Sequence, residues 1–100
     1  MSNVRAIRGA TTADRNSEDA IIDATAELLL ELINANNLKD SDVISAFFTT
    51  TFDLNAQFPA VAARKIGWTD VALMCAHEIS VPNAQSRCIR VMIHINSNRS

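Results

Sequence analysis

The chain has 100 residues, a length that predicts one domain spanning residues 1–100. Its 48% hydrophobic and 20% charged residues are a globular composition, which excludes a wholly disordered chain. A net charge of −2 argues against a general nucleic-acid-binding protein, and no apolar run approaches the ~18–20 residues of a membrane span. Arg5, Arg8 and Asp14 interrupt the start of the chain, so we expect no signal peptide and a cytoplasmic location.

The first half of the chain predicts a strand followed by a long helix. Residues 3–12 alternate between two faces, as a strand does. Ser17 is a suitable N-cap for a helix over residues 18–36, in which apolar side chains recur at i, i+3, i+4 and i+7. Asn36 and Asn37 are expected to end this helix because Asn tolerates a left-handed backbone.

The second half predicts three strands and a short helix. Residues 43–51 are rich in β-branched and aromatic side chains, which favours a strand, and residues 71–77 and 87–96 follow as further strands. Pro59 suits the first position of a short helix that Gly67 ends. The order β-α-β-α-β-β predicts an α+β fold, a mixed β-sheet with helices packed on one face.

The last predicted strand has two different faces. One is apolar and the other is half polar: Ile89, Val91, Ile93 and Ile95 against Cys88, Arg90, Met92 and His94. If the long helix covers the first face, the second still has apolar area to bury, which favours a homo-oligomer with Arg90 in the seam. The alternative is a monomer whose second helix covers that face.

The usual catalytic and metal-binding constellations are missing from the sequence. Cys75, Cys88, His77 and His94 lack the spacing of zinc ligands, so we expect no metal and two free thiols, although one disulfide is conceivable. Cys75 and His77 share a strand face but lie too far apart for a direct hydrogen bond, and Glu78 has no partner carboxylate. Two glycines cannot form a phosphate loop or a dinucleotide fingerprint.

Arginines in apolar surroundings are the sequence's main functional signal. Arg8, Arg64 and Arg90 each lie in such a setting, whereas most of the acids precede residue 43. A guanidinium on a half-buried sheet requires a carboxylate or phosphate partner, so a bound anion is a suitable ligand for these arginines. The alternative for each is a structural salt bridge or an exposed surface side chain.

Several ordered motifs then resemble one known family. They read VRAIRGATT at 4–12, DLNAQFPA at 53–60, VALMCAHE at 71–78 and CIRVM at 88–92, with Arg64 in register between them. Together they resemble the trimeric, non-helical class of chorismate mutases. The resemblance implies a homotrimer built as a pseudo-α/β-barrel, with active sites in clefts between subunits. It also implies the cofactor-free rearrangement of chorismate to prephenate in aromatic amino-acid biosynthesis.

The resemblance also implies roles for the catalytic residues. Arg90 would approach the ether oxygen of the breaking bond and a substrate carboxylate. Arg8 would hold a carboxylate or shape the anion site, and Glu78 would accept a hydrogen bond from the substrate hydroxyl.

Further residues would bind the substrate by the same resemblance. Arg64 would hold a carboxylate or shape the anion site, and Cys75 would lie beside Glu78. Phe58 and Ala60 would line an apolar wall, and Met74 would also contact the substrate.

The chain departs from the family pattern in places. The family's C-terminal segment carries a Tyr that covers the site, and this sequence has no Tyr; Phe52 replaces a common Pro, and Val61 stands where Lys occurs. Cys75 and Glu78 are three residues apart, so they share a cleft only if the strand bulges or ends near residues 76–77, an irregularity we predict. Two alternatives stay open: a reactive imine/enamine deaminase-like hydrolase, and a non-catalytic trimeric relative that binds a dicarboxylate.

Overall fold

A computed structural model describes residues 3–97 of the chain. In chain order the elements are β1 (Asn3–Thr12), α1 (Glu18–Asn36), the 3-10 helix η1 (Asp40–Asp42), β2 (Val43–Thr50), α2 (Ala60–Lys65), β3 (Ala72–His77) and β4 (Cys88–Ser97). The predicted order is confirmed, and no predicted strand end differs from the observed one by more than one residue.

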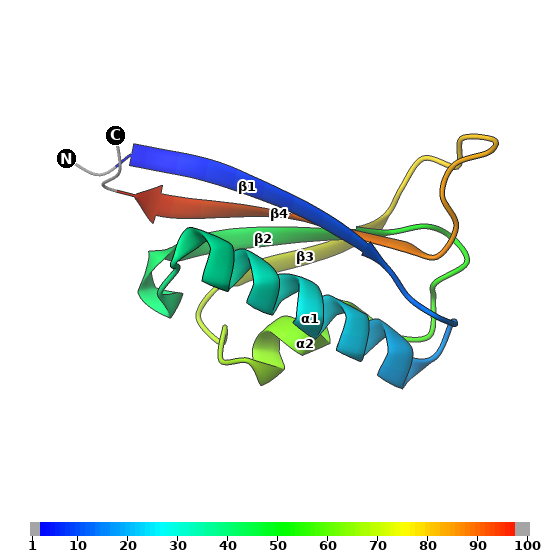
Figure 1. Cartoon of the computed structure of the whole chain (residues 1–100), viewed down its shortest axis with the longest axis horizontal. Coiled ribbons are helices and arrows are strands. Elements are labelled where there is room, and N and C mark those ends of the chain that lie inside the picture. Colours follow the sequence, from blue (N-terminus) through cyan, green and yellow to red (C-terminus); the bar gives the residue numbers. More distant parts are fainter. Residues whose placement is uncertain (1–2, 98–100) are drawn as a thin grey trace.

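The strands form a mixed sheet in the order β1-β4-β2-β3. β4 runs antiparallel to both β1 and β2, while β2 and β3 are parallel because α2 crosses over between them. Both helices pack on the same face of the sheet, and no helix or strand of residues 3–97 covers the opposite face (Figure 1). The alternative in which the second helix covers that opposite face is therefore wrong. We call this uncovered side the outer face.

Local chemistry defines both ends of α1. The Ser17 side chain accepts a hydrogen bond from the Ala20 N–H at 3.1 Å, which satisfies one of the unpaired donors of the first turn. Asn37 adopts a left-handed conformation with φ 54° and donates its N–H to Ile33 O. The predicted N-cap and stop are confirmed.

The core lies between the sheet and the two helices. Phe48, Ile93 and Leu29 are fully buried there, with Trp68, whose indole N–H donates to Asp40 Oδ1 at 3.2 Å. The inward side chains of β4 are buried and the outward ones are not, as its alternation predicted. Cys88 is an exception: it was assigned to the mixed face but is 4% exposed, because it begins the strand where the chain enters the body from the loop.

The short helix starts one residue later than expected. Pro59 has helical backbone angles but occupies the N-cap of α2, and Gly67 follows the helix with φ 107°. Both described cysteines are free thiols. Within residues 3–97 no helix has the length and apolar character needed to cross a membrane.

Candidate active site

The outer face of the sheet is apolar but exposed. The strand registers place four side chains side by side in one row across the sheet: Arg8, Met92, Phe47 and Met74. Met74 is 60% exposed, and Phe47 and Met92 are each 38% exposed. A small domain rarely leaves such a contiguous patch in water, so this face is marked as a binding or interaction surface.

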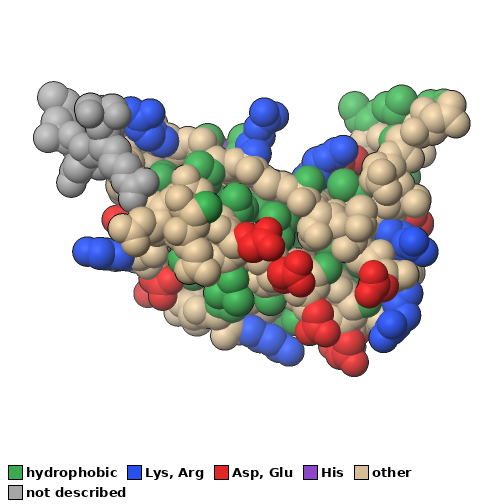
Figure 2. Space-filling view, viewed as in Figure 1, with side chains coloured by type: hydrophobic (Ala, Val, Ile, Leu, Met, Phe, Trp, Pro, Cys, Tyr) green, Lys and Arg blue, Asp and Glu red, His purple; other side chains and the backbone are tan. Residues whose placement is uncertain are grey.

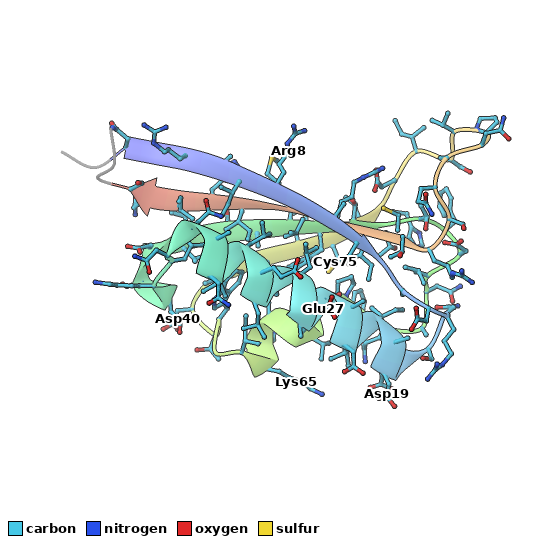
Figure 3. The ribbon with its side chains drawn as sticks, viewed as in Figure 1. Arg8, Asp19, Glu27, Asp40, Lys65 and Cys75 are labelled. Atoms are coloured by element: carbon cyan, nitrogen blue, oxygen red, sulfur yellow. The ribbon has the colours of Figure 1, made fainter. Side chains whose placement is uncertain are left out.

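A hollow of about 590 Å³ opens on this outer face. Its lining comes from β1, β2 and β4: Arg8, Gly9, Ala10, Phe47, Thr49, Arg90, Val91 and Met92. Arg8 projects from β1 away from the helices (Figure 3). Among the described residues no acid forms an ion pair with Arg8, so its charge is available to an anionic ligand.

Arg90 reaches an acid of its own chain at the edge of this hollow. Its Nη1 donates to Glu78 Oε1 in an ion pair, with the Arg90 side chain 51% exposed and that of Glu78 21% exposed. The hydrogen bond to the Glu78 carboxylate raises the pKa of Arg90 above its ordinary value. Arg90 therefore forms the salt bridge that was the alternative to anion binding. Any anion that Arg90 binds has to share the guanidinium with Glu78.

Glu78 follows the last residue of β3 and lies on the outer face, as the alternation of Met74 and Ala76 on that face continues by two residues. The strand stops at His77, and the Glu78 N–H still donates to Thr50 O at 2.9 Å. Its second carboxylate oxygen, Oε2, accepts a hydrogen bond from Thr49 Oγ1 at 3.0 Å. The predicted end of the strand near residue 77 is confirmed.

A second hollow, of about 350 Å³, lies on the other side of β3. Cys75, Phe58 and His77 are among its lining residues. Burial raises the pKa of the Cys75 thiol, an effect partly opposed by the Ala60 backbone and the charge of Arg64. Cys75 is therefore protonated and uncharged near neutral pH.

The sequence-derived site residues thus fall into two groups within one chain. Arg8, Arg90 and Met74 lie on the outer face and Glu78 joins them through its ion pair with Arg90, whereas Phe58 and Cys75 line the second hollow.

Arg64 is exposed in the last turn of α2, in the helix layer. Ala60 is 4% exposed and packs in the core, so the apolar wall expected of it is not open in a single chain. A strand end near residues 76–77 was expected to let Cys75 and Glu78 share a cleft. The strand does end there, but the two side chains do not share a hollow.

Thr49 is the site residue that sequence reasoning missed. It is directly opposite Arg90 in the β2–β4 pairing and lines the same hollow. The only local signal was that Thr49 is polar and faces outward in a strand otherwise rich in apolar side chains. Its contact with Glu78 depends on the pairing of distant strands.

The surrounding charges favour an anion on the outer face. Five of the acids lie on α1: Glu18, Asp19, Asp23, Glu27 and Glu31. Figure 2 shows acidic side chains gathered on the helix side of the molecule, and Figure 3 shows Asp19 and Glu27 projecting there. Within residues 3–97 no cluster of three His, Cys, Asp or Glu side chains could hold a metal ion.

The fold and this cationic, apolar site agree with one enzyme class. Residues 4–100 match the family described as chorismate mutase type I, and the chain belongs to that family. It is 40% identical over 96 residues to chorismate mutase AroH of Bacillus subtilis (strain 168), covering 95% of this chain and 76% of that protein. It is 44% identical over 96 residues to chorismate mutase AroH of Thermus thermophilus, covering 95% of this chain and 79% of that protein.

A solved structure agrees with the fold as well. The chorismate mutase from Clostridium thermocellum superposes with a TM-score of 0.94 at 51% identity, covering 96% of this chain and 86% of that chain. The resemblance read from the sequence motifs is confirmed at the level of the family, and the mixed α+β fold is confirmed with it.

Proposed function

We propose that this protein is an isomerase that rearranges chorismate to prephenate, a step of aromatic amino-acid biosynthesis. The observation that carries the proposal is the pair of cations, Arg8 and Arg90, in an open hollow of an otherwise apolar face. Chorismate is a small dianion with an apolar ring, and such a hollow matches both properties. Membership of the chorismate mutase type I family supports the same activity.

The chemistry requires little more than position and charge. A [3,3] rearrangement forms one bond as another breaks, without a nucleophile, a proton transfer or a cofactor. The enzyme holds the flexible dianion in a near-attack, chair-like shape, so that the two ends of the substrate meet. It also stabilises the negative charge that grows on the ether oxygen as the C–O bond opens, for which Arg90 is the proposed donor.

The ion pair with Glu78 leaves both partners able to bind substrate. It uses Nη1 of Arg90, and a guanidinium has five N–H donors, so others remain for the ether oxygen and a carboxylate. Each carboxylate oxygen of Glu78 has two lone pairs, which leaves an acceptor for the substrate hydroxyl. Glu78 thus holds Arg90 in place and leaves its other donors for the substrate.

We infer that the working assembly is a homotrimer, a pseudo-α/β-barrel with each site between neighbouring chains. What supports this is the division of the site residues between the outer face and the helix layer. A second copy would bring its own exposed Arg64 and Phe58 toward the Arg8–Arg90 hollow, next to Met74, which lies beside Phe47 on the outer face. We place this single-domain enzyme in the cytoplasm.

The test is turnover of chorismate by the purified protein, followed by the loss of its ultraviolet absorbance. Arg90→Ala should lower kcat/KM by at least 10²–10³-fold, the usual cost of removing one donor to a developing oxyanion. Arg90→Lys keeps the charge but loses the fork that serves two oxygens, so it should restore only part of the rate. Arg15→Ala, on the exposed loop before α1, is the matched control and should retain full activity.

Other outcomes would assign the protein differently. Tight chorismate binding without turnover would indicate the non-catalytic dicarboxylate-binding relative. Imine hydrolysis without chorismate turnover would indicate the deaminase-like hydrolase. Full activity in a folded Arg90→Ala variant would remove Arg90 from the mechanism.

A further inference from the structure

Thr49 contacts Glu78, the acid that pairs with Arg90 at the edge of the outer-face hollow. It lies near the end of β2, opposite Arg90 on β4 and opposite Ala76 on β3. Its hydroxyl donates to Oε2 of Glu78 at 3.0 Å while Arg90 donates to Oε1. The three side chains form a chain of contacts in the order Thr49, Glu78, Arg90.

Glu78 depends on this contact for its orientation. Its backbone is the last point tied to the sheet, through its N–H to Thr50 O at 2.9 Å. The loop that follows, residues 79–87, is exposed throughout. Arg90 is itself a long and half-exposed side chain, so it cannot fix the carboxylate alone. Thr49 supplies the second attachment.

Thr49 is well suited to serve as a fixed support. A β-branched side chain has few χ1 rotamers in a strand, and β2 is hydrogen-bonded to a neighbouring strand on each side. A hydrogen bond to an ionised carboxylate is also stronger than one between neutral groups. The donor therefore stays in place when the substrate arrives.

We propose that Thr49 is a positioning residue, which orients Glu78 and, through Glu78, the guanidinium of Arg90 for the reaction. This inference rests on the proposed chorismate mutase activity. Small displacements of catalytic groups cost large factors in rate, so the hydroxyl influences turnover without touching the reacting bond.

The test compares two substitutions at one position. Thr49→Val keeps the shape and removes the hydroxyl, and it should lower kcat and kcat/KM together by about tenfold, as expected for a lost hydrogen bond to a charged group. Thr49→Ser keeps the hydroxyl and should stay within about threefold of the unchanged protein. Thr69→Val, an exposed threonine in the loop after α2, is the control and should have no effect.

A double-mutant cycle then asks whether Thr49 acts through Glu78. In a Glu78→Ala background the Thr49→Val change should alter kcat/KM by less than about twofold, because the group it orients is gone. Multiplicative effects of the two changes would overturn the proposal. So would equal losses in the Val and Ser variants, or full activity in Thr49→Val.

Two controls keep the outcome interpretable. Far-ultraviolet circular dichroism checks folding, and if the Val variant does not fold, Thr49→Ala carries the same comparison with Ser. If the wild-type protein does not turn over chorismate, the proposed function itself is contradicted. If the wild-type protein is active and removal of the Thr49 hydroxyl has no effect on its activity, only the role of Thr49 is contradicted.

Discussion

Arg8 and Arg90 line the same hollow but differ in their electrostatic state. Arg90 is paired with Glu78, whereas Arg8 has no ion-pair partner among the described residues. An ion pair orients a cation, and an unpaired cation attracts an anion more strongly. Arg90 is therefore suited to a fixed contact in the transition state, and Arg8 to capture and retention of the dianion.

Reversing the charge at Arg8 should separate these two roles. Arg8→Glu should raise KM by about tenfold or more at low salt, because a charge now repels the substrate at close range. Salt screens exposed charges over about 10 Å at 0.1 M, so the difference from the unchanged protein should narrow as salt is added. The measurement is KM against ionic strength.

The matched control for this prediction is Arg15→Glu. It changes the net charge equally but lies on the exposed loop between β1 and α1. Its KM should stay close to that of the unchanged protein. An equal KM in Arg8→Glu would make Arg8 a structural residue, and an equal rise in both variants would indicate a general field effect.

The charge of Asp53 stabilises the fold through two hydrogen bonds. Its carboxylate accepts a hydrogen bond from Thr51 Oγ1, and Oδ2 accepts the Arg87 N–H at 2.9 Å. The Thr51 hydroxyl, followed by the Arg87 backbone, holds the pKa of Asp53 below its ordinary value of 3.8. These contacts tie the loop after β2 to the start of β4.

This lowered pKa predicts the acid dependence of stability. A carboxyl group with a lower pKa in the folded state stabilises the fold above its unfolded pKa, and that contribution disappears as the pH falls through the folded value. Asp53→Asn should therefore be less stable than the unchanged protein at about pH 6, with the difference shrinking below about pH 4. Urea denaturation at each pH measures it.

Asp70→Asn is the control for this experiment, since Asp70 is exposed and takes no part in these hydrogen bonds. It should leave the acid dependence unchanged. A constant difference between the Asp53→Asn variant and the unchanged protein at every pH would show that the charge of Asp53 is not what matters.

At the scale of elements, α1 lies close to β1 because of one glycine. A Cβ at position 9 would lie 2.9 Å from Leu28 Cδ1 and 3.0 Å from Leu32 Cδ1. These are ends of flexible side chains, so they can shift, but at a cost. Gly9→Ala should destabilise the fold by about 1–3 kcal/mol, as overpacking usually does.

A second background identifies the cause of that cost. Where Leu28 is already Ala, the added methyl group has room, so Gly9→Ala should cost less there than in the unchanged protein. Denaturant midpoints of the four proteins measure the coupling. Equal costs in both backgrounds would place the strain elsewhere, in the strand itself.

The elements were predictable because their signals are local. The alternation of β4 and the i, i+3, i+4 spacing of α1 each lie within one stretch of sequence, as do the Ser17 and Asn37 caps. The choice of sheet face by α2 is not local. It depends on a crossover between parallel strands, and the alternative in which the second helix covers the outer face was wrong for that reason.

The sequence predicted which residues belong to the candidate site better than it predicted how they are arranged. Arg8 and Arg90 meet because β1 and β4 pair, and residues 8 and 90 then fall on one face. The contact of Thr49 with Glu78 needs the register of three strands, which no local pattern specifies. The separation of Cys75 from Glu78, in contrast, follows from their three-residue spacing, which places them on opposite faces of the strand.

At the scale of the whole molecule, the outer face resembles half of an interface. One chain buries its core between sheet and helices, yet leaves Phe47, Met74 and Met92 at 38–60% exposure on the other side. In water this area is unfavourable at roughly 25 cal/mol per Å². Burying it against further copies would both stabilise the chain and supply the residues that the Arg8–Arg90 hollow lacks.

The trimer can be tested by placing a charge on that face. Sedimentation equilibrium of the unchanged protein should give three times the 10.9 kDa mass of the chain at micromolar concentration. Phe47→Asp should give monomers and lose turnover, because a buried unpaired charge is costly in an apolar seam. Leu30→Asp is the control: Leu30 is 49% exposed but lies on α1, away from the outer face, so this variant should remain trimeric and active. A monomeric unchanged protein, or a trimeric and active Phe47→Asp variant, would contradict a site built between subunits.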